Sequence, residues 1–126
     1  MSELRANTLS DAAGTGPVTL TGQSAAKAWV NLNGTGTVAT RDSYNVSSLT
    51  DNGTGAYSIG FTNAWDNVNY SASGAAGSSA FSTNVYVTSP RASVPTTSAT
   101  TIGSKTDTNS PADSEYVQVS YNGDLA

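Results

Sequence analysis

Residues 24–62 have the sequence SAAKAWVNLNGTGTVATRDSYNVSSLTDNGTGAYSIGFT, in which apolar and polar residues alternate over three short runs. Two copies of the turn NGTG, at 33–36 and 52–55, separate these runs at a spacing of 19 residues. Asn-Gly between alternating runs favours a hairpin, because both central residues of a type I′ turn need positive φ. Gly36 and Gly55 each suit a left-handed position just beyond the turn. The stretch therefore predicts an antiparallel β-meander.

Each run places its apolar residues on one side, as period-2 alternation requires of strands that face a core. Further strand-like runs lie at 68–72, 81–87 and 115–121, and no helical period appears. We therefore predict an all-β fold, a small antiparallel β-sandwich or meander. The predicted inward residues are Ala28, Val30 and Leu32; Val38, Tyr44 and Val46; Tyr57, Ile59 and Phe61; and Val117, Val119 and Tyr121.

The chain divides into an extended N-terminal arm over 1–23 and a β-domain over 24–126, with a Ser/Thr-rich loop region at about 90–114. The arm is either a frayed terminus whose last strand joins the sheet, or an anchor that orders against another subunit or partner protein. Its apolar residues have no obvious partner within the arm and are the candidates for anchoring or subunit contact. They are Leu4, Leu9, Val18 and Leu20.

The composition provides little apolar surface. Leu, Ile, Val and Phe account for 20 of the 126 residues, below the roughly 20% at which an independent core becomes doubtful. Ser, Thr, Gly and Asn account for 60 residues, and the net charge is only −4. Burial against identical subunits would compensate for a thin core, so we expect a homo-oligomer, most simply a homotrimer.

Several absences narrow the function. The chain has no Cys and no His, which removes thiolate chemistry, the commonest general base and the commonest metal ligand. We expect no cofactor and no metal. No apolar run reaches transmembrane length, and the first residues lack the apolar core of a signal peptide, so we expect synthesis in the cytosol without secretion or membrane insertion. Five scattered basic residues argue against a nucleic-acid surface.

Aromatic residues are the best candidates for binding. Trp65 lies beside Asp66 and near Tyr70, and this group has the chemistry to stack on a sugar ring and bond its hydroxyls. The competing interpretation makes Trp65 an anchor that closes the sheet, or a subunit contact, since Trp is enriched in buried hot spots. Trp29 has the parity opposite to Val30, which suggests a second inner face or a subunit contact, with exposed binding as a third option.

The nine carboxylates raise the question of glycan hydrolysis, which needs a pair across a cleft. Asp42 and Asp51 flank the middle run, but Asp51 precedes Asn-Gly, where Asp favours a turn by bonding its own backbone. Residues 107–115 carry oxygen ligands at odd spacing, yet Pro111 and Ala112 break the pattern of a calcium loop. We therefore expect neither catalysis nor a metal site.

Three segments carry a resemblance to a known group of proteins: 11–17 (DAAGTGP), 27–31 (KAWVN) and 45–55 (NVSSLTDNGTG). They resemble tail-fibre and fibre-like virion proteins of tailed bacteriophages, including phages of marine bacteria and cyanobacteria. The resemblance covers about residues 2–73. It implies a β-rich, usually trimeric virion appendage that contacts the host surface, and the length of 126 residues leaves no room for a long shaft.

The resemblance leads us to expect a non-enzymatic virion structural protein, made in the host cytoplasm, that contributes to host attachment as a tail-fibre component. Its partners would be further copies of itself, other virion proteins of tail or capsid, and host surface glycan. The alternative is a capsid decoration or cement protein, or a head fibre, whose arm clamps neighbouring capsid subunits.

Overall fold

The computed structural model describes residues 25–79, 85–88 and 93–126, and these residues form eight β-strands. No helix occurs among the described residues. The strands are β1 (Ala28–Asn33), β2 (Ala39–Tyr44), β3 (Val46–Asp51), β4 (Ala56–Phe61), β5 (Ser71–Gly77), β6 (Val85–Thr88), β7 (Ala99–Thr106) and β8 (Tyr116–Asn122).

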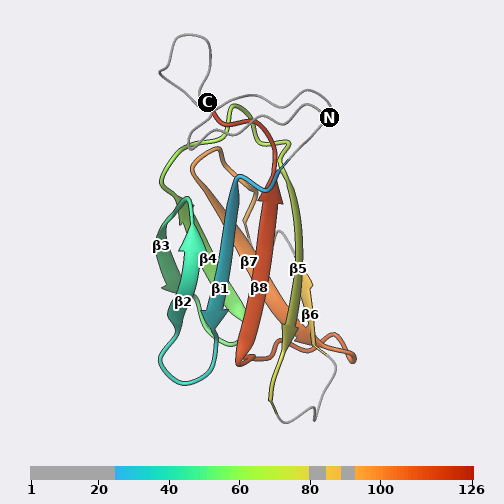
Figure 1. The fold of residues 1–126 in the computed structure, drawn as a ribbon. Coiled ribbons are helices and arrows are strands. Elements are labelled where there is room, and N and C mark those ends of the chain that lie inside the picture. Colours follow the sequence, from blue (N-terminus) through green and yellow to red (C-terminus); the bar gives the residue numbers. More distant parts are fainter. Residues whose placement is uncertain (1–24, 80–84, 89–92) are drawn as a thin grey trace, which may run out of the picture.

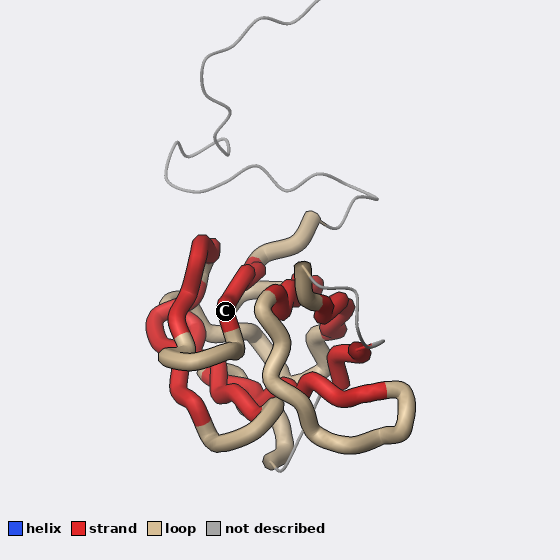
Figure 2. The backbone as a smooth tube through the Cα atoms, turned by 90° about the horizontal axis from the view of Figure 1, so that it is seen from below, coloured by secondary structure: helices blue, strands red, loops and turns tan. Residues whose placement is uncertain are grey.

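Hydrogen bonding connects the strands in the order β2-β1-β8-β5-β6-β7-β4-β3, with antiparallel neighbours throughout (Figure 1). Short β6 meets β5 at one pair, Ala76↔Val85, so it links a four-stranded layer, β2-β1-β8-β5, to a three-stranded layer, β7-β4-β3. Figure 2 looks along the strands and shows them surrounding one interior. The predicted all-β class and small antiparallel sandwich are confirmed. The homotrimer remains a prediction, and the arm at 1–23 lies outside the described residues.

The interior contains the alternate residues that the sequence predicted from β1, β4 and β8. Eleven apolar side chains there are at most 6% exposed, so one chain forms a core between its own two layers. The two layers of a single chain thus bury these side chains against each other, and the homo-oligomer stays a prediction. The buried residues are Ala28, Val30, Leu32, Tyr57, Ile59, Phe61, Trp65, Ile102, Val117, Val119 and Tyr121.

Asn45 turns the chain from one layer to the other. Its φ of 56° lies in the left-handed region, which Asn tolerates better than most residues. The side-chain amide donates to the carbonyl of Lys27 at 3.1 Å and accepts from the N–H of Asn63 at 2.7 Å. Consequently β2 pairs with β1, and β3 pairs with β4. The middle strand of the predicted meander is therefore two strands in different layers.

The prediction that Tyr44 shares an inward face with Val38 and Val46 is wrong. Tyr44 is 57% exposed, whereas both valines pack against the core. The register between β1 and β2 shifts so that Arg41 has no residue directly opposite, which is a β-bulge. The bulge and the positive φ of Asn45 each interrupt the period of two, and neither is visible in the hydrophobic pattern.

Both NGTG segments turn the chain, although not as type I′ turns. Gly36 and Gly55 have positive φ, as expected, but the described non-glycine residues with positive φ do not include Asn33 or Asn52. The loop after β7 holds both turns. The N–H of Gly34 donates to the Ser114 carbonyl at 2.8 Å, and the N–H of Gly55 donates to Oδ1 of Asp113 at 2.6 Å. Both turns therefore form hydrogen bonds to the loop after β7, and the sequence around each turn gives no sign of these contacts.

Two strands differ from the sequence prediction. The strand expected at 68–72 lies instead at Ser71–Gly77 and pairs with β8 along its whole length. Within the expected loop region at about 90–114 lies β7, which buries Thr100, Ile102 and Ser104. Cross-strand pairing with β4 and β6 stabilises β7 although it has a single large apolar residue. Strand β6 covers only the end of the run expected at 81–87, and 81–84 lie outside the described residues.

Candidate functional site

The two layers present different outer faces. On the β7-β4-β3 layer the outward residues are mostly small or hydroxylated, such as Thr50, Ser58 and Thr101, and Lys105 near the end of β7 is the exception. The β2-β1-β8-β5 layer instead carries aromatic rings and amides on its outer side. We call this surface the Trp29 face. Its outward residues are Trp29 and Asn31 of β1, Asp42 and Tyr44 of β2, Tyr116, Gln118 and Ser120 of β8, and Ser73 and Ala75 of β5.

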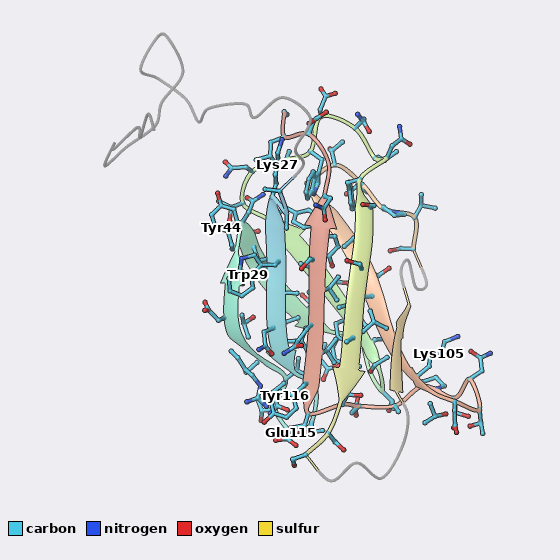
Figure 3. The ribbon with its side chains drawn as sticks, turned by 45° about the vertical axis from the view of Figure 1, so that its right-hand side comes forward. Lys27, Trp29, Tyr44, Lys105, Glu115 and Tyr116 are labelled. Carbon is cyan, nitrogen blue, oxygen red and sulfur yellow. The ribbon has the colours of Figure 1, made fainter. Side chains whose placement is uncertain are left out.

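The register across this layer arranges the face in rows. Tyr44 lies directly opposite Trp29, which lies opposite Ser120. In the next row, Asp42 lies opposite Asn31, and Asn31 lies opposite Gln118. Residues directly opposite on antiparallel strands have neighbouring side chains on the same side of the sheet. Trp29 and Tyr44 are therefore neighbours on this face, near the end where β1 begins (Figure 3).

A second aromatic position lies at the other end of the face. The guanidinium carbon of Arg41 lies 4.4 Å from the centre of the Tyr116 ring, and its Nη2 donates to the Glu115 carbonyl at 2.9 Å. The β-bulge in β2 re-aims the Arg41 side chain, as bulges commonly do. Sequence reasoning missed this arrangement, because no local signal marks the bulge. Figure 3 shows Tyr116 and Glu115 together at this end.

Glu115 joins this end to the loop after β5. Its Oε2 accepts from the N–H of Ser79 at 3.0 Å and from the Ser79 hydroxyl at 2.7 Å. These hydrogen bonds, the N–H first, hold the pKa of the Glu115 carboxyl below its ordinary value, because they favour the charged form. At the opposite end, Nζ of Lys27 lies 3.3 Å from Oδ1 of Asp124, an exposed ion pair of small energetic value.

Amides, hydroxyls and the Asp42 carboxylate occupy the space between the two aromatic positions. Asn31, Gln118 and Ser120 come from adjacent strands β1 and β8, and Ser73 of β5 lies opposite Ser120. The Oδ1 atom of Asn31 is buried and accepts no hydrogen bond from the described residues. A buried acceptor without a donor is costly, and such groups are rare in folded proteins. Four other buried side-chain atoms among the described residues also lack a partner, and an atom without accessible surface offers no position to a bound molecule.

The structure places the candidate glycan residues Trp65 and Tyr70 together, but inside the sandwich. Trp65 is 1% exposed and stacks on Tyr70 with ring centroids 4.8 Å apart. It also contacts the edge of Phe61 at 5.4 Å. A ring buried to this degree offers no face to a sugar, so the interpretation of Trp65 as a structural anchor fits this geometry.

Tyr70 and Asp66 also make structural contacts. The Tyr70 hydroxyl donates to the carbonyls of Thr96 at 3.0 Å and Ala99 at 3.3 Å, and burial raises the pKa of the Tyr70 hydroxyl. The N–H of Asp66 donates to the Asp124 carbonyl at 2.8 Å, while its carboxylate is exposed. Of the anchoring candidates, Trp29 lies half-buried on the Trp29 face. Leu4, Leu9, Val18 and Leu20 lie outside the described residues.

The carboxylates considered for chemistry act in turns and loops. Oδ1 of Asp51 accepts from the N–H of Gly53 at 2.9 Å, which is the turn role predicted for it. Oδ1 of Asp113 accepts from the Tyr57 hydroxyl at 3.2 Å as well as from Gly55. Burial, and secondarily the charge of Asp113, raises the pKa of the Tyr57 hydroxyl. In the part of the chain that the structure describes, no three acidic side chains are grouped so that they could hold a metal ion.

No helix within the described residues is long and apolar enough to cross a membrane. No family model, no curated protein and no solved structure matches this chain.

Proposed function

We propose that the chain is a non-enzymatic structural protein of a bacteriophage virion, and that it serves as a tail-fibre component in host attachment. The observation that carries this proposal is the Trp29 face. Tyr44 remains 57% exposed and Trp29 half-buried on paired strands, while the outward residues of the other layer are mostly small and polar, apart from Lys105. Exposed rings on a rigid sheet are suited to recognition rather than to core packing.

The segments that resemble phage fibre proteins support the same proposal, because one of them forms part of the Trp29 face and another forms the corner and a strand of the opposite layer. Residues 27–31 enter and form most of β1, including Trp29. Residues 45–55 form the corner, strand β3 and the turn before β4. The resemblance thus involves both the strand that carries Trp29 and the corner at which the chain changes layers.

The chain ends are placed so that the sandwich could attach to the virion at one end and display the Trp29 face along its side. The N–H of Lys27 donates to the Tyr121 carbonyl at 2.9 Å, so the described chain starts beside the end of β8 (Figure 1). The loops after β1, β3 and β7 meet at the opposite end through Gly34 and Gly55. An arm over 1–23 that docks on the virion would hold the first end and leave the Trp29 face accessible.

The proposed partners are further copies of the chain, in a homotrimer, and other virion proteins. Three copies would multiply weak contacts with the host into avidity without tight binding at any one site. The engagement of Asp51, Asp113 and Glu115 in backbone and hydroxyl hydrogen bonds supports a role without catalysis.

The first test is antibody–gold labelling of intact virions, viewed by electron microscopy. We expect label on the tail or its tip. Label over the head would replace attachment with capsid decoration, and absence of label would refute a virion role. A phage carrying Trp29→Ala should adsorb to its host more slowly than wild type, while Thr101→Ala on the opposite layer should leave adsorption unchanged. Deletion of 1–20 should prevent incorporation into the virion.

A further inference from the structure

We infer that the turn between β3 and β4 modifies itself, because the main-chain nitrogen of Gly53 attacks the side-chain amide of Asn52 and ammonia is released. The attack closes a succinimide ring, and water then opens the ring to aspartate or isoaspartate. The chain is consumed in this reaction, so the reaction is a modification of the protein and not an enzymatic activity. The inference goes beyond the proposed function and does not depend on it.

The attacking group is the Gly53 N–H, and a carboxylate lies beside its proton. Oδ1 of Asp51 accepts from this N–H at 2.9 Å. An amide nitrogen attacks a carbonyl carbon only as its proton leaves, and a carboxylate at hydrogen-bond distance can take that proton. Gly53 has a φ of 103°, and a Cβ built there would meet no heavy atom within 4 Å. No neighbouring group among the described residues therefore obstructs closure of the ring.

The leaving group is the Asn52 side-chain amide, and a hydroxyl lies beside it. Nδ2 of Asn52 donates to Oγ of Ser58 at 2.7 Å. Once the carbonyl carbon has been attacked, this nitrogen is an amine, and the Ser58 hydroxyl can then donate a proton to it. The two reacting groups thus each contact a side chain that can move the required proton, one as acceptor and one as donor.

The atoms balance without an oxidant, a reductant or a cofactor. One bond forms between the Gly53 nitrogen and Cγ of Asn52, and the bond from Cγ to Nδ2 breaks. The proton that Gly53 gives to Asp51 replaces, by way of solvent, the proton that Ser58 gives to the departing ammonia. Asp51, Asn52 and Gly53 are all exposed, so water reaches the ring and adds to either of its carbonyls. Either product has one more carboxylate than the starting chain.

The other copy of NGTG provides an internal comparison, because the same four residues have different neighbours. The N–H of buried Gly34 donates to the Ser114 carbonyl at 2.8 Å, and a carbonyl oxygen is too weak a base to take an amide proton. Oδ1 of Asn33 accepts from the Thr35 N–H at 3.2 Å and from its hydroxyl at 2.9 Å, which holds the amide in place. The preceding residue is Leu32, which has no carboxylate. We therefore expect Asn33 to be stable.

The third Asn–Gly sequence, at 122–123, is restrained by packing. A Cβ built at Gly123 would lie 2.8 Å from Cβ of Tyr70 and 3.1 Å from Cε3 of Trp65. The preceding residue is Tyr121, which is buried and supplies no carboxylate. Asn52–Gly53 is therefore the Asn–Gly sequence of this chain that combines exposure, open space and a carboxylate at the attacking nitrogen.

Modification would disturb the start of β4. Two hydrogen bonds close the turn, from the Asn52 N–H to the Ala56 carbonyl and from the Ala56 N–H to the Gly53 carbonyl, both at 2.9 Å. Isoaspartate adds one main-chain carbon within this turn. Gly55 in the same turn has no spare room, since a Cβ there would lie 2.7 Å from the Ala112 nitrogen. Protein that contains isoaspartate should therefore unfold at a lower urea concentration than fresh protein.

The test is incubation of the purified full chain in neutral buffer, followed by peptide mapping with mass spectrometry, which measures the loss of the amide at each Asn separately. A parallel sample in urea gives the rates in the unfolded chain, where the two NGTG segments should react at similar rates. In the folded chain we expect Asn52 to react at least about tenfold faster than Asn33, and faster than Asn52 does in urea.

Variants test the two proton-transfer residues. Asp51→Ser keeps an oxygen that can accept the Gly53 N–H but removes the base, so it should slow the reaction of Asn52 by at least about tenfold. Ser58→Ala removes the donor at the leaving group and should slow the reaction by at least about threefold. Asp42→Ser is the matched control, because Oδ1 of Asp42 likewise accepts from a main-chain N–H, that of Ser43 at 2.8 Å. It should leave the rate at Asn52 unchanged.

Three results would overturn the inference. The first is slower reaction of Asn52 in the folded chain than in urea, which would show that its hydrogen bonds protect the amide. The second is an equal rate at Asn52 and Asn33 in the folded chain. The third is an unchanged rate in Asp51→Ser, which would leave Asp51 with its turn role alone. If Asp51→Ser did not fold, an unchanged rate in Ser58→Ala would overturn the inference in its place.

Discussion

Replacing Asn45 tests the corner that divides the predicted meander between two layers. Its amide nitrogen donates to the carbonyls of Lys27 at 3.1 Å and Asn63 at 3.3 Å, and its Oδ1 accepts from the Asn63 N–H at 2.7 Å. The backbone φ is 56°. Asn45→Ala removes all three hydrogen bonds and places an alanine in the left-handed region, whereas Asn45→Gly removes the bonds but adopts this φ freely.

The expected magnitude follows from these two contributions. Each hydrogen bond contributes about 1 kcal/mol, so losing three, with the Asn63 N–H left without its acceptor, costs about 3 kcal/mol. Placing an alanine at a left-handed φ costs about 1 kcal/mol more. We therefore expect Asn45→Ala to lower the free energy of unfolding by about 4 kcal/mol and Asn45→Gly by about 3 kcal/mol. Either loss is a large part of the roughly 5–15 kcal/mol that stabilises a domain.

The assay is equilibrium unfolding of the full chain in urea, followed by the fluorescence of buried Trp65. Asn67→Ala is a matched control, because the Asn67 Oδ1 makes a local hydrogen bond to the Asn69 N–H in an exposed loop. Asn67→Ala should lower the free energy of unfolding by no more than about 1 kcal/mol. If Asn45→Ala changed the free energy of unfolding by less than about 1 kcal/mol, the corner would not depend on this side chain and our reasoning would be refuted.

Three further predictions concern the core, a close contact and pH. With Trp65→Phe, the remaining Trp29 should be readily quenched by acrylamide, whereas with Trp29→Phe the remaining Trp65 should be protected; equal quenching would contradict their placement. Gly34→Ala would bring a Cβ against the Tyr57 hydroxyl and within 2.9 Å of the Ser114 carbonyl oxygen. Thermal unfolding should therefore show that the free energy of unfolding falls by about 2 kcal/mol. Gly77→Ala, which meets no heavy atom within 4 Å, should stay within about 0.5 kcal/mol of wild type. The Ser79 N–H and hydroxyl hold the pKa of Glu115 below its ordinary value of 4.5, so its contribution to stability is present above pH 4.5 and is lost as the pH falls through the lowered pKa. Glu115→Gln should therefore lower the urea midpoint at pH 7, and the difference from wild type should close in acid; a difference independent of pH would contradict this assignment.

The regular strands were predictable from local pattern. Period-2 alternation identified the inward residues of β1, β4 and β8, and these residues are at most 6% exposed. Asp51 was likewise predictable, since an Asp before Asn-Gly bonds its own turn, as it does to the Gly53 N–H. Strand β7 was not predictable, because Ile102 is its single large apolar residue and its position between β4 and β6 supplies the pairing.

The candidate site also combines features that the sequence predicts with features that only the tertiary structure sets. Sequence singled out Trp65 and Trp29 as the aromatic residues to consider, but it had no means of deciding which ring faces solvent. The choice depends on the path of the chain after β4, which stacks Trp65 on Tyr70 inside the sandwich. Arg41 and Tyr116 were missed entirely, because the bulge that brings them together is set by the pairing of β1 with β2.

The sequence by itself therefore determined the class of fold, the inward faces of three central strands and the approximate positions of the turns. These features depend on neighbours within a few residues, where alternation and turn chemistry act directly. Only the tertiary structure decided the layer to which each strand belongs, the outward position of Trp29 and Tyr44, and the burial of Trp65. Those outcomes depend on contacts between residues far apart in the chain, such as Asn45 with Asn63 and Arg41 with Tyr116, which no local pattern encodes.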